Sequence, residues 1–296
     1  MKAGERGFLM LTSHLGDPQC KPMTVAQFRT LTMRVRTMEK PQEERLLTLK
    51  DLQALGYGEA FAAHILYLLS REEQLEHYVN RARQYNCYPI TRINQAYPQV
   101  LRQRLGEDAP GCLWYKGNPE ILKNRCISLV GSRDLQPDNL AFAREAGRQA
   151  ALQGYVLVSG NARGADRTAQ ESCLAAGGQV ISIVADSLEK CPIDPNALYL
   201  SENSYETGFS AQRALSRNRL IHAMGVLTLV VQSCLEKGGT WSGTVQNLRQ
   251  CYSPVFCFQD GSESASALCQ MGAAFVDIYD LADYNALQMP DITLFQ

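Results

Sequence analysis

Residues 126–133 read CISLVGSR, and residues 155–166 read YVLVSGNARGAD. In each stretch a short apolar run leads directly into glycine, serine and arginine. A run that is apolar on both faces is typical of a parallel strand covered by helices on both sides. The two stretches therefore predict two strands of a parallel sheet, each followed by a glycine-rich loop.

The same alternation continues toward the end of the chain. We expect strands at 126–130, 155–158, 180–184, 226–231, 255–258 and 274–278, with helices at about 139–153, 165–176, 210–223, 242–251 and 264–271. Short strands that alternate with helices predict an α/β fold with a doubly wound, mostly parallel sheet over residues 126–296.

The chain before residue 85 is helical in character. Thr48 begins a T-x-x-D capping pattern, and Ser70 begins S-R-E-E, a capping box that opens another helix. The LGYG turn at 55–58 resembles that of a helix-hairpin-helix module, which offers N–H groups to phosphate, and an ordinary turn between helices is the reading we favour. We expect a small helical domain at 1–85, and a proline-containing tract at 86–125 that connects to and begins the α/β domain.

Composition narrows the class of protein. The chain has 296 residues, of which 45% are hydrophobic and 20% charged. This is ordinary for a globular chain, and neither a membrane-spanning run nor a secretory signal is visible. We expect a cytoplasmic protein with no membrane association.

The cysteines and histidines suggest no metal site. The ten cysteines are scattered without a C-x-x-C pair, and the four histidines are far apart in the sequence. We interpret the cysteines as small buried hydrophobic residues in a reducing compartment, and we expect neither a metal nor another cofactor.

The net charge is −1, but residues 81–133 hold nine Lys and Arg against three acids. This excess indicates either a phosphate-facing surface or a solvated helix face.

The loops after three expected strands carry the candidate site. Ligands of open α/β sheets bind where the strands end, and glycines, hydroxyls, helix N-termini and arginines suit phosphate. We expect Asp166 to support the loop by accepting N–H groups or by orienting Arg163, and Arg217 and Arg219 to bind phosphate unless they pair with Glu202 or Glu206. The candidate phosphate-binding residues are Gly131, Ser132, Arg133, Ser159, Gly160, Arg163, Gly164, Asp166, Arg217, Asn218, Arg219, Gly238, Gly239 and Thr240.

Six motifs resemble the DprA/Smf family of DNA-processing proteins. They are Tyr97-Pro98-x-x-Leu101, Trp114-Tyr115-x-Gly117-Asn118, Val130-Gly131-Ser132-Arg133, Ser159-Gly160-x-Ala162-x-Gly164-x-Asp166, Leu200-Ser201-Glu202 and Arg217-Asn218-Arg219-x-Ile221. The resemblance covers residues 85–278. It implies an extended Rossmann-like domain preceded by a SAM-like helical domain, single-stranded DNA as partner, a homodimer, and supporting roles for Ser201 and Glu202.

The sequence also departs from that family. Gln170 stands where members usually have a histidine, and Gly238–Thr244 reads GGTWSGT in place of the family's Ser-Gly-Ser-Leu pattern. The chain stops at Gln296, so we expect a divergent member without a C-terminal winged helix. A RecA-like recombinase and a free nucleotide are further candidate partners.

A nucleotide-binding alternative stays open. The related LOG-type phosphoribohydrolases carry a G-G-x-G-T-x-x-E motif, which residues 238–247 partly echo, but Asn247 stands where the catalytic glutamate is expected. Walker A and G-x-G-x-x-G motifs are missing from the sequence. We therefore expect single-stranded DNA binding in DNA processing or recombination rather than catalysis, with a SLOG-type nucleotide sensor or a LOG-like enzyme as the alternative.

Overall fold

The computed structural model describes residues 1–38 and 46–289. The chain divides into two compact units, one formed by Met1–Tyr97 with Pro110–Leu113 and the other by Pro98–Ala109 with Trp114–Gln296. The expectation that a C-terminal winged helix is missing refers to the chain end at Gln296, which lies outside the described residues.

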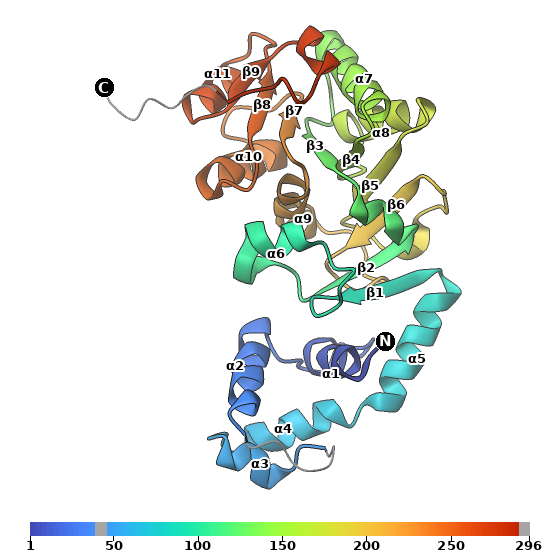
Figure 1. Cartoon of the computed structure of the whole chain (residues 1–296), viewed down its shortest axis with the longest axis vertical. Helices are drawn as coiled ribbons and strands as arrows, with labels where there is room; N and C mark the ends of the chain where they lie inside the picture. The colour runs from blue at the N-terminus through green and yellow to red at the C-terminus, as the bar shows by residue number, and fades with distance from the viewer. Residues whose placement is uncertain (39–45, 290–296) are drawn as a thin grey trace. The chain divides into compact units, whose positions relative to one another are not determined.

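The first unit is mainly helical (Figure 1). Leu11, Leu31, Leu52, Ile65 and Leu68 form part of its buried core. Its elements are α1 (Ala3–Thr12), α2 (Val25–Arg36), α3 (Leu49–Ala54), α4 (Glu59–Leu69), α5 (Glu72–Gln84) and the strand β1 (Cys87–Thr91).

The two predicted helix caps have different outcomes. The Thr48 hydroxyl accepts from the Asp51 N–H and the Asp51 carboxylate accepts from the Thr48 N–H, so this capping box is confirmed. The box at Ser70 is wrong, because Ser70 ends α4 and Arg71 is the N-cap of α5. The buried Arg71 guanidinium instead donates to the carbonyls of Met10 and Ser13.

The second unit holds the parallel part of the sheet. Its elements are α6 (Gln99–Leu105), most of β2 (Cys112–Gly117), β3 (Cys126–Val130), α7 (Pro137–Leu152), β4 (Val156–Ser159), α8 (Ala165–Ala175), β5 (Gln179–Ile183), β6 (Ala197–Ser201), α9 (Ala211–Met224), β7 (Thr228–Val230), α10 (Gly238–Gln250), β8 (Val255–Phe258), α11 (Glu263–Gln270) and β9 (Ala274–Val276). Short 3₁₀ helices lie at Gly106–Asp108, Pro119–Lys123, Leu188–Lys190 and Tyr279–Ala282.

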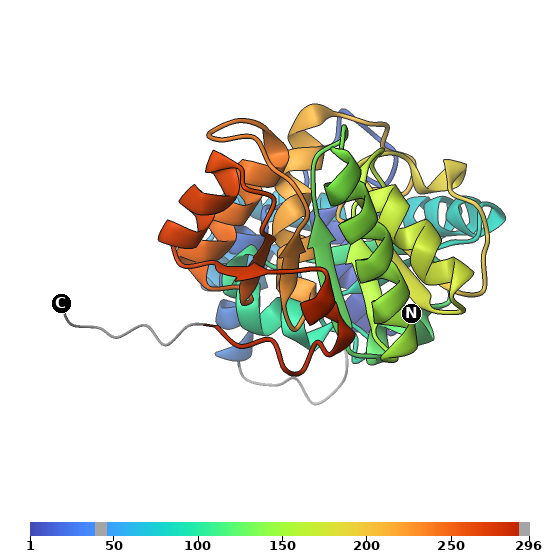
Figure 2. The ribbon, with the colours of Figure 1, turned by 90° about the horizontal axis from the view of Figure 1, so that it is seen from above.

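Within the described residues the sheet has nine strands in the order β1-β2-β6-β5-β4-β3-β7-β8-β9. The ladder from β6 to β9 is parallel throughout, and β2 pairs antiparallel with β6. Helices α7 and α8 pack together on one face, and α9 and α10 pack together on the other (Figure 2). From β3 the chain first adds β4, β5 and β6 toward one edge of the sheet, and it then adds β7, β8 and β9 toward the other edge. Because the crossover connections between parallel strands are right-handed, this change of direction places the connecting helices on opposite faces of the sheet.

The expected α/β fold with a doubly wound, mostly parallel sheet is confirmed. All six expected strands and five expected helices of the second unit are present, and β3 and β8 have the expected bounds. Three strands were not expected, namely β1, β2 and β6. Helix α10 begins at Gly238, four residues before its expected start at 242.

Five of the ten cysteines are buried as expected, three are partly buried and two are exposed. Cys234 and Cys251 are exposed, whereas Cys20, Cys87 and Cys257 are buried as expected. Among the described residues, no helix is both long and apolar enough to cross a membrane.

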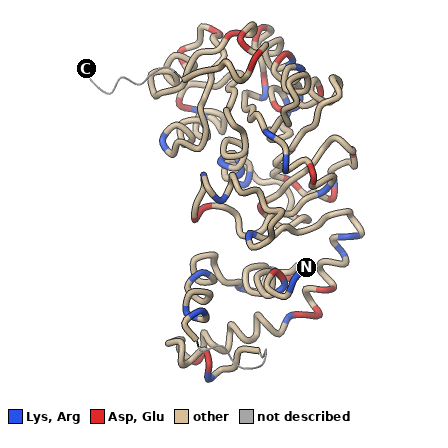
Figure 3. Tube along the Cα trace, in the orientation of Figure 1, with Lys and Arg blue, Asp and Glu red and all other residues tan. Residues whose placement is uncertain are grey.

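The basic run at 81–133 is not one solvated face. Lys116 is only 6% exposed and donates to the Glu189 carbonyl, while Arg104 donates to the carbonyls of Ala223 and Gly225. Figure 3 shows Lys and Arg spread over many segments of the chain. Positive charge relevant to phosphate therefore has to be located residue by residue.

Candidate functional site

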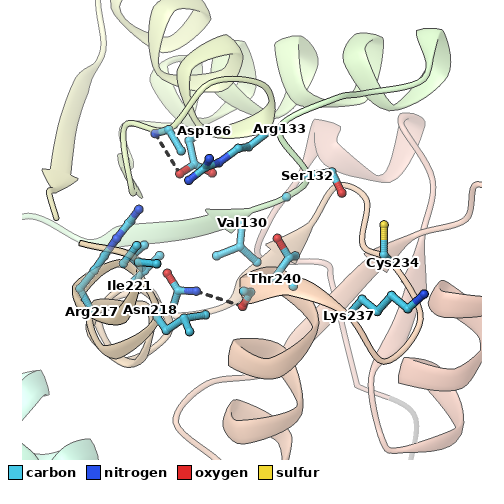
Figure 4. Close-up of a pocket in the computed structure, with 17 residues that line it drawn as sticks. Val130, Ser132, Arg133, Asp166, Arg217, Asn218, Ile221, Cys234, Lys237 and Thr240 are labelled. Atoms are coloured by element: carbon cyan, nitrogen blue, oxygen red, sulfur yellow. Dashed lines mark hydrogen bonds between the residues drawn. The ribbon is translucent and has the colours of Figure 1, made fainter. Parts of the chain in front are cut away.

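The sheet changes its direction of winding between β3 and β7. After β3 the chain builds β4, β5 and β6 on one side, and then α9 brings it back to place β7 on the other side. The loops that follow β3 and β7 diverge at such a point and leave a crevice at the carboxyl ends of the strands. A cavity of about 440 Å³ lies there (Figure 4).

Nine of the fourteen candidate phosphate-binding residues line this cavity, which we call the switch-point cavity. They are Gly131, Ser132, Arg133, Asp166, Arg217, Asn218, Gly238, Gly239 and Thr240. Cys234 and Lys237 also line the cavity and were not among the candidate residues. Four chain segments far apart in sequence thus meet at one crevice, as the strand pattern predicts.

Arg217 is the central charged group of the cavity. It lies on α9, the residue is only 6% exposed, and its Nε and Nη1 have no hydrogen-bond partner among the described residues. Burial lowers the pKa of this guanidinium, and the carboxylate of Asp166 opposes that shift. A buried guanidinium with open donors is costly unless an anion completes it. Arg217 is therefore the strongest indication of an anion site.

Asp166 stabilises the loop that precedes α8. Its Oδ2 accepts the backbone N–H of Gly160 at 3.0 Å and that of Ala162 at 3.3 Å. Burial raises the pKa of Asp166 overall, and the neighbouring Arg217 and these N–H groups only partly oppose that shift. The carboxylate thus has the loop-supporting role expected for it. It does not orient Arg163, which pairs with Asp134 at 2.6 Å.

Gly160 and Gly164 do not leave room for a ligand, contrary to expectation. A Cβ on Gly160 would lie 1.5 Å from Nη1 of Arg217, so this glycine makes room for the guanidinium. A Cβ on Gly164, whose φ is +87°, would lie 2.4 Å from the backbone oxygens of Ser132 and Arg133. Gly164 therefore lets the loops after β3 and β4 pack against each other.

The first turn of α10 forms the opposite wall. Gly238, Gly239 and Thr240 line the cavity, and no side chain caps this helix N-terminus. The Nδ2 of Asn218 donates to the Gly239 carbonyl at 3.0 Å, which holds α9 and α10 together at the cavity (Figure 4). The first N–H groups of a helix have no partner within the helix and carry partial positive charge, so they favour a phosphate.

The remaining candidates lie away from the cavity lining or serve the fold. Ser159 is fully buried and donates to the Leu129 carbonyl. Arg219 forms an ion pair with Glu202 at 2.6 Å, which was the alternative to phosphate binding for this residue. Ser201 is buried, and its hydroxyl accepts a hydrogen bond from Arg213. Both Arg217 and Arg219 lie within the regular helix α9, so they point in different directions.

The two positions that depart from the related families are structural. Gln170 is buried and donates to the Ile181 carbonyl and the Ser182 hydroxyl. Asn247 is fully buried, donates to Nδ1 of His222 and Oγ of Ser253, and accepts the Ser253 N–H. Neither side chain lines the cavity, where Asp166 is the only carboxylate among the lining residues.

The buried His222 predicts a specific response to acid. Burial lowers its pKa to about 3, and within the part of the chain that the structure describes its Nε2 has no hydrogen-bond partner. The unfolded chain takes up a proton near pH 6.5 but the folded chain does not, so stability is complete above that pH and is lost as the pH falls. We expect this residue to contribute a loss of about 2 kcal/mol between pH 7 and pH 5.

Urea unfolding of the wild type and of His222→Asn at both pH values checks this expectation. The variant should be less stable at pH 7 but should show a smaller loss on acidification. Equal losses in the two proteins would mean that His222 is protonated in the folded state.

Comparison with known proteins agrees with this geometry. The family model for DNA recombination-mediator protein A matches residues 89–284. The DNA processing protein DprA of Bacillus subtilis is 28% identical over 176 residues, which cover 56% of this chain and 58% of that protein. The protein Smf of Synechocystis is 22% identical over 236 residues, which cover 74% of this chain and 58% of that protein.

Solved structures show the same fold. The crystal structure of DprA from Streptococcus pneumoniae matches with a TM-score of 0.71 at 21% identity, over 95% of this chain and 98% of that one. DprA from Helicobacter pylori, described as having a unique single-stranded DNA binding mode, matches with a TM-score of 0.54 at 24% identity over 66% of this chain and 92% of that one. The second unit is thus a Rossmann-like α/β domain of the DprA type.

Since the family match extends over well more than half of its residues, the chain belongs to the DNA recombination-mediator protein A family, the DprA/Smf proteins of DNA processing. The aligned regions span little more than half the length of the curated relatives from Bacillus subtilis and Synechocystis.

Proposed function

We propose that this protein binds single-stranded DNA through phosphate contacts in the switch-point cavity. The observation that carries the proposal is the buried Arg217 guanidinium, whose Nε and Nη1 have no partner in a cavity that a helix N-terminus also lines. A phosphate can accept from both groups. The Helicobacter pylori relative, which binds single-stranded DNA, supports this choice of ligand.

The chemistry of the cavity favours a single strand over duplex. Its donors are backbone N–H groups, hydroxyls, guanidinium groups and the Lys237 ammonium, which recognise phosphate and carry no base sequence information. The cavity is a recess at the carboxyl ends of the strands, which suits the backbone of a single strand. We infer binding with little dependence on sequence.

A salt titration with three ligands tests the proposal. We expect oligothymidylate of about 20 nucleotides to bind more tightly than duplex of equal length, with an affinity that falls steeply as salt rises. Fluorescence anisotropy of labelled oligonucleotides measures this, with unlabelled mononucleotides as competitors. Equal affinity for duplex contradicts the proposal.

The same titration decides the nucleotide-sensor alternative. A mononucleotide that displaces the oligonucleotide stoichiometrically, at an affinity nearly independent of salt, would favour a nucleotide pocket. Release of free base from a nucleotide would favour a LOG-like enzyme. The single lining carboxylate, Asp166, is already engaged by two N–H groups, which favours binding over acid–base catalysis.

The homodimer and the RecA-like recombinase partner are part of the proposal. Strand β9 forms one edge of the sheet, and Met271, Phe275 and Tyr279 beside it are 51%, 46% and 85% exposed. An edge strand with exposed apolar side chains is suited to association with a second copy. Light scattering of the purified chain measures the oligomeric state, and the partner needs a pull-down with a purified recombinase.

A further inference from the structure

A second cavity adjoins the switch-point cavity. It has a volume of about 730 Å³ and lies beyond Arg217, between the loop after β4 and the segment after β5. Arg133, Ala162, Ala214 and Arg217 line both cavities. We call it the adjoining cavity. Both volumes fall in the range of roughly 300–1,000 Å³ typical of ligand sites.

The adjoining cavity has the charge of a polyanion site. Arg133, Arg163, Arg167, Lys190 and Arg217 line it, and Asp186 is its only carboxylate. Neither Arg167 nor Lys190 is among the candidate residues derived from the sequence. Arg217, the buried guanidinium with open donors, faces both cavities, so a phosphate bound to it lies where the two meet.

An aromatic ring stands in this basic cavity. Phe209 lines it and is 57% exposed, so its ring is accessible from the cavity. The ring belongs to the segment just before α9, where it can offer a face to a planar ligand. Aromatic rings in positively charged grooves stack the bases of single strands, and every base has a face suited to this.

Asp186 braces the chain segments that carry these groups. Its carboxylate accepts Nζ of Lys190 at 3.0 and 3.1 Å, the N–H of Ser187 at 2.8 Å and the backbone N–H of Phe209. Burial would raise the pKa of Asp186, but these hydrogen bonds lower it overall, so the carboxylate stays ionised at neutral pH. The carboxylate of Asp186 thus connects the backbone of Phe209 to the ammonium group of Lys190.

We propose that one DNA strand occupies both cavities, with phosphates on either side of Arg217 and one base stacked on the ring of Phe209. This inference rests on the proposed function and extends it. A ligand that fills both cavities has to be a continuous strand rather than a single nucleotide. Arg167 and Lys190 then neutralise the phosphate next to the stacked base.

Substitutions at Phe209 test the stacking contact. We expect Phe209→Ala to lower the affinity for a 12-nucleotide oligothymidylate about tenfold, since a base stacked on a ring is worth about 1–3 kcal/mol. Phe209→Trp should keep the affinity, and its indole fluorescence should be quenched on binding. The matched control is Tyr67→Ala, which removes an aromatic side chain of similar exposure, 52%, outside both cavities and should change nothing.

A crosslinking experiment locates the base independently. Oligothymidylate carrying a single 5-iododeoxyuridine is irradiated with the wild-type protein, and the modified peptide is identified by mass spectrometry. We expect modification at Phe209 for at least one position of the photoreactive base, and its loss in Phe209→Ala.

The two proposals fail differently. A wild-type protein that binds no single strand would overturn the proposed function and this extension with it. Tight wild-type binding with unchanged affinity in Phe209→Ala, no quenching in Phe209→Trp and crosslinks elsewhere would overturn the extension alone.

Discussion

Arg217→Gln is expected to weaken single-stranded DNA binding about a hundredfold. The variant removes a buried guanidinium whose Nε and Nη1 are open to a phosphate, and hydrogen bonds of charged groups are worth roughly 1.5–3 kcal/mol. Anisotropy titration at constant salt measures the change. Arg148→Gln is the matched control, because it removes an equal charge from α7, where Arg148 pairs with Glu145, and should leave binding unchanged.

Stability has to be separated from binding in this experiment. Without Arg217 the buried carboxylate of Asp166 loses the Coulombic stabilisation that this guanidinium gives it, so we expect the variant to be less stable than the wild type. The double variant Asp166→Asn with Arg217→Gln should recover part of this stability, because an asparagine oxygen still accepts from Gly160 and Ala162. It should not recover binding, and a double variant with wild-type affinity would remove Arg217 from the site.

Gly160→Ala reaches the same guanidinium without removing it. The added methyl would meet the far end of the Arg217 side chain, which can swing away at small cost to the fold. We expect a loss of affinity that approaches that of Arg217→Gln, with a smaller loss of stability, because the guanidinium is displaced but stays in the protein.

Gly164→Val is expected to produce the largest loss of stability, about 4 kcal/mol in the free energy of unfolding. The side chain would meet the backbone oxygens of Ser132 and Arg133 at 2.4 Å, and the residue would be strained at φ +87°. Strain and overpacking each contribute roughly 1–3 kcal/mol. Chemical denaturation of wild type and variant measures the difference.

The control for this variant is Gly177→Val. Gly177 also has a positive φ, +79°, but a Cβ there would have open space around it. It therefore reports strain alone and should cost less by about 1–3 kcal/mol. Equal losses in the two variants would show that the loops after β3 and β4 do not depend on close packing at Gly164.

The buried strands could be predicted because their sequence pattern is local. Residues 126–130 and 255–258 are apolar on both faces, as covered parallel strands require, and they give β3 and β8 with the expected bounds. The missed strands depend on partners instead. In β2, Lys116 and Gly117 break the apolar run, and the strand is stabilised by antiparallel pairing with β6.

The site was predictable in its position and less so in its details. Glycines and arginines after strands predict a candidate site at the carboxyl edge of the sheet, and the structure brings most of these residues together there because parallel strands end at one edge. Which arginine is buried with open donors could not be read from the sequence. The burial of Arg217 depends on the missing Cβ of Gly160, 57 positions away in the sequence, and Arg219 two residues later is held instead by Glu202.

Because the cavity is lined by segments from both halves of the sheet, its residues emerge from the ribosome at different times during synthesis. Arg133 and Asp166 leave the ribosome early, Arg217 later, and the wall formed by Gly238 and Thr240 last. Since β7 pairs with β3 across about a hundred residues of intervening chain, the crevice closes only when nearly the whole second unit has emerged. A nascent chain can therefore collapse around β3, β4 and β5 well before it can hold a nucleic-acid strand.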